Sequence, residues 1–204
     1  MMNARAPLLV LACGALAHEI MALREANGWA QMDVQCLPAQ LHNRPNLIPG
    51  AVRDKLRELR PHYDRIYVAY ADCGTGGMLD EVLAEEGIER LPGAHCYEFF
   101  AGGPNFAALA EEEPCTFYLT DFLAWHFERL VIEGLGIDRH PELLPLYFGN
   151  YKRLVYLAQT DPPLRLDEAR QAAERLGLAF EHRFTGYGDL EKGLRAASRV
   201  DAAA

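Results

Sequence analysis

The chain alternates between short runs of β-branched and aromatic residues and longer segments in which apolar residues recur every three or four positions. The first pattern is typical of buried strands, and the second is typical of amphipathic helices. We expect strands at 7–12, 33–37, 65–71, 89–91, 116–120, 153–158 and 178–184. We expect helices between them, at 15–26, 47–59, 78–86, 105–111, 121–133, 142–150, 167–176 and 190–197.

Strands that alternate with helices of about ten residues pair in parallel through right-handed crossovers. The sequence therefore predicts an α/β fold, a doubly wound three-layer α/β/α arrangement on a parallel sheet. A chain of 204 residues, half of them hydrophobic, suits a single α/β domain over 1–204. The segments 64–70 and 152–158 resemble each other, so two similar halves, 1–114 and 115–200, are a further expectation.

Charge limits the classes of partner. The net charge is −9 and no block of Lys and Arg stands out, so neither nucleic acid nor an anionic membrane surface is an expected partner. No apolar run approaches the ~20 residues that span a bilayer, and the short apolar run near the amino terminus reads better as a first core strand than as a signal peptide. We expect a cytoplasmic protein. Its five cysteines are odd in number and widely spaced, which favours reduced thiols.

Soft ligands follow three of the predicted strands. The first strand runs into Cys13, the third into Cys73, and the fourth leads to His95 and Cys96. The carboxyl ends of parallel strands meet at one edge of a sheet, where open α/β folds place their ligands. Cys13, Cys73 and one of His95 or Cys96 would give three ligands with an open fourth position, which is the arrangement of a catalytic zinc site.

Two carboxylates accompany these ligands. Asp72 precedes Cys73, and Glu98 follows Cys96 by two residues. Either is a candidate general base or the carboxylate that orients a ligating histidine. The competing interpretation is that free cysteine behaves as a small buried hydrophobe. We adopt that interpretation for Cys36 and Cys115, where no polar groups converge.

A second candidate site would hold an anionic small-molecule substrate. The glycine-rich turn after the third strand resembles an anion cradle at a helix amino terminus, and its N–H groups would also lower the pKa of the adjacent Cys73 thiol. The alternative is a tight strand-to-helix turn with no ligand. The candidate contacts, including a loop after the second strand, are Gly74, Thr75, Gly76, Gly77, His42, Asn43 and Arg44.

Several motifs together resemble the bacterial and archaeal family called domain of unknown function 1638, from about residue 8 to residue 195. They are Ala12-Cys13-Gly14-Ala15, Leu41-His42-Asn43, Asp72-Cys73-Gly74-Thr75-Gly76-Gly77, His95-Cys96-Tyr97-Glu98-Phe99-Phe100-Ala101-Gly102 and Tyr147-Phe148-Gly149-Asn150-Tyr151. The resemblance brings no catalytic residues to transfer. It implies one-carbon metabolism, because members accompany corrinoid-dependent methyl-transfer proteins, which are candidate partners. No DxHxxG-type motif is present, so a corrinoid cofactor bound by this chain is not supported.

Three functional hypotheses remain open at this point. The first is a zinc-dependent enzyme or metal-binding accessory protein, with methyl transfer as the implied reaction. The second is a metal-free enzyme in which Cys13 and Cys73 act as acid and base, as in two-cysteine racemases. The third is an accessory protein that binds an anionic small molecule. Mixed charge and exposed aromatic residues are compatible with a homodimer.

Overall fold

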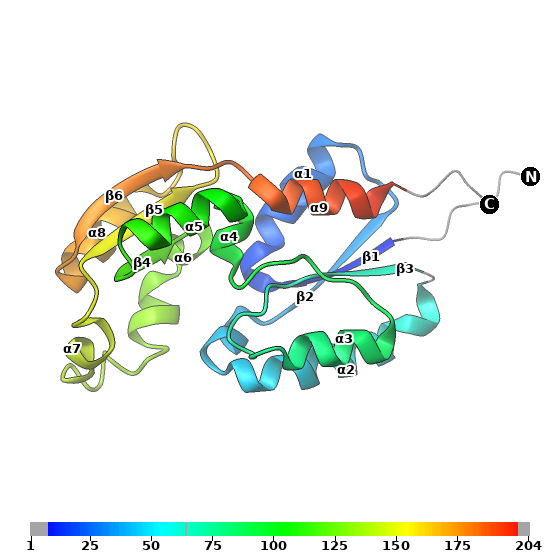
Figure 1. The fold of residues 1–204 in the computed structure, drawn as a ribbon, viewed down its shortest axis with the longest axis horizontal. Coiled ribbons are helices and arrows are strands. Elements are labelled where there is room, and N and C mark those ends of the chain that lie inside the picture. The colour runs from blue at the N-terminus through cyan, green and yellow to red at the C-terminus, as the bar shows by residue number, and fades with distance from the viewer. Residues whose placement is uncertain (1–7, 64, 200–204) are drawn as a thin grey trace, which may run out of the picture. The chain divides into compact units, whose positions relative to one another are not determined.

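The computed structural model describes residues 8–63 and 65–199, and it consists of two compact units (Figure 1). Among the described residues, the first unit contains 8–63 and 65–96 together with 190–199, and the second contains 97–189. Each unit carries one three-stranded parallel sheet with helices, which confirms the α/β class and the expectation of two similar halves. The boundary between the units lies at 96/97 rather than at 114/115, and the end of the chain returns to the first unit.

The first sheet has the strand order β2-β1-β3. Its members are β1 (Leu8–Cys13), β2 (Met32–Leu37) and β3 (Arg65–Ala69), and Leu8 pairs with both Met32 and Arg65. The central strand β1 is buried on both sides, which explains its unbroken apolar sequence. The predicted strand 89–91 is reduced to one parallel bridge between Val68 and Arg90.

Helices lie on both sides of the first sheet. In Figure 1, α1 (Ala17–Ala26) and α9 (Gly188–Ser198) lie on one side, and α2 (Ile48–Leu59) and α3 (Met78–Glu86) lie on the other. Gly193 allows α9 to pack closely: a Cβ there would lie 2.2 Å from Leu91 Cδ1 and 2.9 Å from Tyr67 Oη. The three-layer arrangement is therefore present in this unit.

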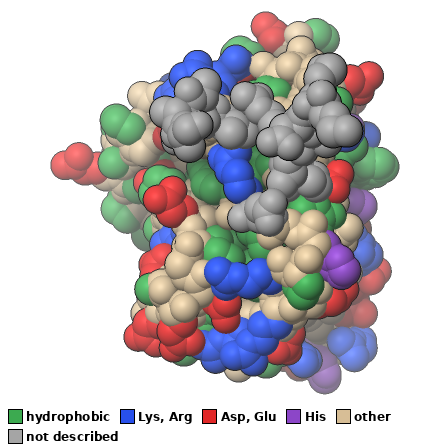
Figure 2. Space-filling view, turned by 90° about the vertical axis from the view of Figure 1, so that its right-hand side faces the viewer, with side chains coloured by type: hydrophobic (Ala, Val, Ile, Leu, Met, Phe, Trp, Pro, Cys, Tyr) green, Lys and Arg blue, Asp and Glu red, His purple; other side chains and the backbone are tan. Residues whose placement is uncertain are grey.

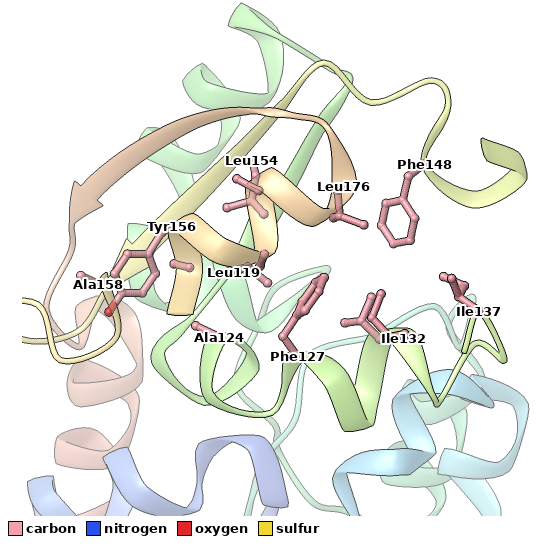
Figure 3. Packing of buried hydrophobic residues seen from close by; sticks show 14 residues of the cluster. Leu119, Ala124, Phe127, Ile132, Ile137, Phe148, Leu154, Tyr156, Ala158 and Leu176 are labelled. Carbon is pink, nitrogen blue, oxygen red and sulfur yellow. The ribbon is translucent and has the colours of Figure 1, made fainter. Parts of the chain in front are cut away.

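The second sheet has the order β4-β5-β6. Its strands are β4 (Thr116–Leu119), β5 (Arg153–Ala158) and β6 (Ala179–Phe184). The buried residues of β5 alternate between two clusters, as expected for a strand covered on both faces. Leu154, Tyr156 and Ala158 belong to the cluster drawn in Figure 3, and Val155 and Leu157 belong to the other.

The helices of the second unit account for the position of the boundary. They are α4 (Cys96–Ala101), α5 (Gly103–Glu112), α6 (Asp121–Trp125), α7 (Leu143–Phe148) and α8 (Leu166–Leu176). Tyr97 and Phe106 pack against Tyr118 of β4, so α4 and α5 belong with the second sheet. The short helix α4 was not expected, and the helix expected at 121–133 is instead α6 followed by a π-helix at Glu128–Ile132.

Surface charge is mixed on the face drawn in Figure 2, where Lys and Arg side chains lie among acidic, hydrophobic and other residues. Within the described ranges, no helix is long and apolar enough to cross a membrane.

Candidate thiol site at the carboxyl edge of the first sheet

Connecting segments meet where the strands of the first sheet end. At the end of β1, an ideal Cβ on Gly14 would lie 3.0 Å from the carbonyl oxygen of Leu37 and 3.3 Å from the nitrogen of Ala39, so a side chain there would push against the end of β2. The turn after β3 approaches the same loop, because an ideal Cβ on Gly74 would lie 3.6 Å from Pro45. These contacts place the ends of β1, β2 and β3 side by side.

The segment that leads to α4 joins the same edge. The backbone N–H of Asp72 donates to the carbonyl of Gly93 at 3.0 Å, and the N–H of Cys73 donates to the carbonyl of Ala94 at 2.8 Å. Because Cys96 follows Ala94 by two residues, these hydrogen bonds bring it to the turn that carries Cys73. The backbone therefore delivers thiols from separate segments of the chain to one place.

Three thiols interact electrostatically at this edge. Burial, followed by the effect of Cys13, raises the pKa of the Cys73 thiol to about 12. Burial also raises the pKa of the Cys13 thiol, and it raises the pKa of Cys96 well above the ordinary value, with Cys73 and Cys13 contributing to the Cys96 shift. The expected lowering of the Cys73 pKa is therefore wrong. These shifts disfavour the thiolate form that a metal-free Cys13 and Cys73 acid–base pair would need.

Tyr70 lies beside these thiols. Its side chain is 1% exposed, and its hydroxyl has no nitrogen or oxygen partner in the described ranges. The Cys13 thiol is close enough to affect its charge. Burial first, and then the nearby cysteines, raise the pKa of the Tyr70 phenol. The site thus contains a buried hydroxyl that no sequence motif indicated.

The glycine-rich turn is filled by its own carboxylate. Asp72 accepts hydrogen bonds from Thr75 Oγ1 at 2.6 Å and from the N–H groups of Gly77, Gly76 and Gly74 at 2.9, 3.1 and 3.2 Å. The expected anion cradle is therefore occupied by a side chain of the same loop, a local competition that aspartate favours. The same hydrogen bonds, the one from Thr75 foremost, lower the pKa of Asp72, so this carboxylate is a poorer general base than expected.

Cys73 has an unusual backbone conformation. Its φ of +51° makes it the one non-glycine residue with positive φ among the described residues. A side chain in this region costs of order 1–2 kcal/mol. The hydrogen bonds at Asp72 and Cys73 hold the conformation in place, and strain of this kind occurs preferentially at functional sites.

The other residues predicted to belong to the site lie in different places. His42 belongs to a 3-10 helix (Ala39–Asn43), and burial followed by repulsion from His95 lowers its pKa, so the two imidazoles lie in the same region. His42 is nevertheless an exposed residue. Asn43 and Arg44 are exposed. Glu98 lies on α4 within the second unit, with its carboxylate beside Gly103.

The other two cysteines do not fit the expected buried position. Cys36 is exposed near the end of β2, opposite Ala12 in the sheet register, and burial together with the effect of Cys13 raises its pKa. Cys115 is half-buried in the second unit, where its N–H donates to Glu113 at 3.1 Å. Cys36 is therefore not the small buried hydrophobe that was expected, whereas Cys115 is partly buried; each lies near the end of an outer strand of its sheet.

The thiols gather without forming a finished ligand set. Within the described part of the chain, no group of three or more His, Cys, Asp or Glu side chains is positioned to hold a metal ion. The donor types suit a soft metal, and the three thiols influence one another, but their present side-chain positions do not converge on one point.

The fold and the site define a two-unit α/β protein with a thiol cluster at the carboxyl edge of its first sheet. The chain matches the family described as "Protein of unknown function (DUF1638)" over residues 36–194, and it belongs to that family. The resemblance seen in the sequence motifs is thereby confirmed. No curated protein and no solved structure matches the chain.

Proposed function

We propose that the carboxyl edge of the first sheet binds a soft metal ion, with zinc as the first candidate and Cys13, Cys73 and Cys96 as its ligands. The observation that carries this proposal is that three thiols from three segments of the chain gather in one buried place. Burial raises the pKa of each thiol, and a negative charge on one of them raises the pKa of its neighbours further. A bound cation reverses this relation, because each thiolate is then paired with positive charge.

Metal binding requires a local adjustment. Since the thiols do not converge in the present conformation, at least one must rotate about its Cα–Cβ bond to complete the set. His95, adjacent to Cys96 and close to His42, is the candidate fourth ligand or the group that contacts a bound substrate. The Tyr70 hydroxyl would become a partner for a sulfur that a metal has deprotonated.

The reaction class that we propose is methyl transfer involving a small-molecule thiol or a corrinoid partner protein. The support is the family resemblance, together with three soft sulfur ligands that would leave a fourth coordination position open. Zinc, when bound, holds a thiol as its nucleophilic thiolate at neutral pH. The chain's own residues would supply the three sulfur ligands and the position of the site at a sheet edge.

Metal content tests the proposal. Full-length protein purified without chelator should carry about one equivalent of zinc by elemental analysis, and chelated protein should take up one equivalent in a calorimetric titration. The C13S, C73S and C96S variants should each lose this metal, whereas C36S and C115S are matched controls that should retain it. Folded wild-type protein that neither carries nor takes up zinc, cobalt or another soft metal would overturn the proposal.

A further inference from the structure

Strand β6 forms an open edge of the second sheet. The sheet order β4-β5-β6 gives β6 one neighbour, and β6 is drawn as the orange arrow in Figure 1. Most of its residues are exposed, including His182 and Arg183, and Phe184 is 58% exposed. An uncovered edge of this length is a template for pairing with another strand.

The free backbone groups of β6 belong to three residues. The N–H of Ala179 donates to Lys152 at 3.1 Å, and the N–H of Thr185 donates to Ala158 at 2.9 Å, so alternate residues from 179 to 185 face β5. The N–H and C=O groups of Phe180, His182 and Phe184 therefore face away from β5. No backbone hydrogen bond outside the β5–β6 ladder reaches these three residues in the described ranges.

The sequence of β6 is complementary to itself in the antiparallel direction. A two-fold axis at His182 places Phe180 opposite Phe184 of the second copy, and it places Glu181 opposite Arg183 of the second copy. Two aromatic pairs and two pairs of opposite charge result, and both kinds of cross-strand pair stabilise a sheet. His182 lies opposite its own copy at the axis. A shift of the register by two residues loses these pairings.

We propose that two copies of this chain associate through antiparallel pairing of their β6 strands, which joins the two second-unit sheets into one six-stranded sheet. A two-fold dimer of this kind closes on itself and leaves no further edge at the interface. The opposed pairs of Phe180, His182 and Phe184 each exchange two hydrogen bonds, six in total.

Charged residues on an edge strand often serve only to prevent association. Here the two charges lie at positions 181 and 183, on the same face of the strand, and Arg183 already donates to Glu181 within one copy. Glu181 also pairs with Arg153 at 3.0 Å. A strand with the same charge at both positions would place one like-charge pair opposite Glu181 or Arg183. An antiparallel second copy of β6 places opposite charges at both positions. Because one strand pair buries little surface, we expect a micromolar dissociation constant, on the order of transient interfaces.

Charge reversal tests the register as well as the interface. In the R183E variant both opposed charge pairs become Glu against Glu, and in E181R both become Arg against Arg. For each variant alone, the dimer dissociation constant should rise about tenfold or more above that of the wild type. Sedimentation velocity on the full-length chain measures this constant. An equimolar mixture of the two variants restores opposite charges at both pairs and should form a heterodimer of near wild-type stability.

One further substitution makes the result decisive. His182→Pro removes an outward N–H and leaves the β5 ladder intact, so it should weaken the dimer while far-ultraviolet circular dichroism stays unchanged. The mixing experiment also protects against misfolding, because a misfolded variant cannot be rescued by its counterpart. A wild-type chain that remains monomeric at about 100 µM would overturn the proposal and leave the edge for a strand of a different protein. A dimer that none of these substitutions changes would also overturn it.

Discussion

Replacing Asp72 by Ala should destabilise the first unit, because this carboxylate organises the turn that carries Cys73. It accepts hydrogen bonds from the buried Thr75 hydroxyl at 2.6 Å and from the half-buried Gly77 N–H at 2.9 Å, and two weaker bonds come from exposed glycine N–H groups. The bonds from Thr75 and Gly77 should each contribute about 1–1.5 kcal/mol, and water replaces the other two at little cost. The expected loss in free energy of unfolding is about 2–3 kcal/mol.

The effect should depend on pH in a defined direction. The pKa of Asp72 is lowered in the folded protein, chiefly by the hydrogen bond from Thr75. A lowered carboxyl pKa contributes stability that is present above the unfolded value, about 3.9, and is lost as the pH falls through the folded value. The difference between wild type and Asp72→Ala should therefore be constant from pH 6 to 7 and should shrink below about pH 4.

Urea unfolding followed by tryptophan fluorescence measures the difference in free energy of unfolding between wild type and Asp72→Ala, provided that the signal comes from the first unit. The chain has two tryptophans, Trp29 in the first unit and Trp125 in the second, so a Trp125→Phe background restricts the signal to the first unit. Asp54→Ala is the matched control, since Asp54 is an exposed acid on α2. An Asp72→Ala protein within about 0.5 kcal/mol of the control at pH 7 would refute the reasoning.

Other expected outcomes concern packing, a buried hydrogen bond and thiol exposure. Gly193→Ala should lower the stability of the first unit by about 1–3 kcal/mol in the same urea assay, because its Cβ would lie 2.2 Å from Leu91. Gly50→Ala should instead raise that stability by about 0.5–1 kcal/mol, because no atom lies within 4 Å of the added Cβ. Tyr156→Phe should lower the stability of the second unit by about 1.5–3 kcal/mol, because the buried Tyr156 hydroxyl donates to the Asp121 carboxylate. Urea unfolding of a Trp29→Phe protein, followed by Trp125 fluorescence, measures this loss. A loss smaller than about 0.5 kcal/mol would contradict the prediction. In metal-free protein at pH 7.5, Cys36→Ser should remove the fastest phase of a colorimetric thiol assay, because the exposure of Cys36 to the reagent outweighs its raised pKa; an unchanged fastest phase would contradict this.

Local patterns were sufficient to predict most of the fold. Buried runs such as 153–158 and the amphipathic segment 78–86 coincide with β5 and α3, because burial on both faces gives an unbroken apolar run and burial of one helix face gives a helical period. The boundary between the units was not predictable in this way. It depends on α4 and α5 packing against Tyr118, a contact between distant segments that leaves no local signal.

The sequence indicated which segments meet at the end of the first sheet, but it did not indicate the electrostatics there. Strand-end cysteines indicated the carboxyl edge, where the backbone joins Cys73 to the segment leading to Cys96. The sequence did not reveal that Asp72 would consume the N–H groups of the turn, since this depends on side-chain geometry within one loop. It also did not reveal the role of burial, which outweighs the turn and raises the Cys73 pKa to about 12. A signal for Tyr70 was present in its position two residues before Asp72, but an aromatic residue at a strand end is ordinarily core.

Cobalt titration tests the central claim most directly, because thiolate ligands give cobalt(II) an intense charge-transfer absorption whose size follows the number of bound sulfurs. Full-length, metal-free protein should take up one equivalent and show the absorption of three thiolates, and zinc should displace the cobalt. C13S, C73S and C96S should each reduce the absorption per bound cobalt by about one third, while C36S leaves it unchanged. A folded wild-type protein that binds cobalt without this absorption, or does not bind it, would contradict the thiol metal site.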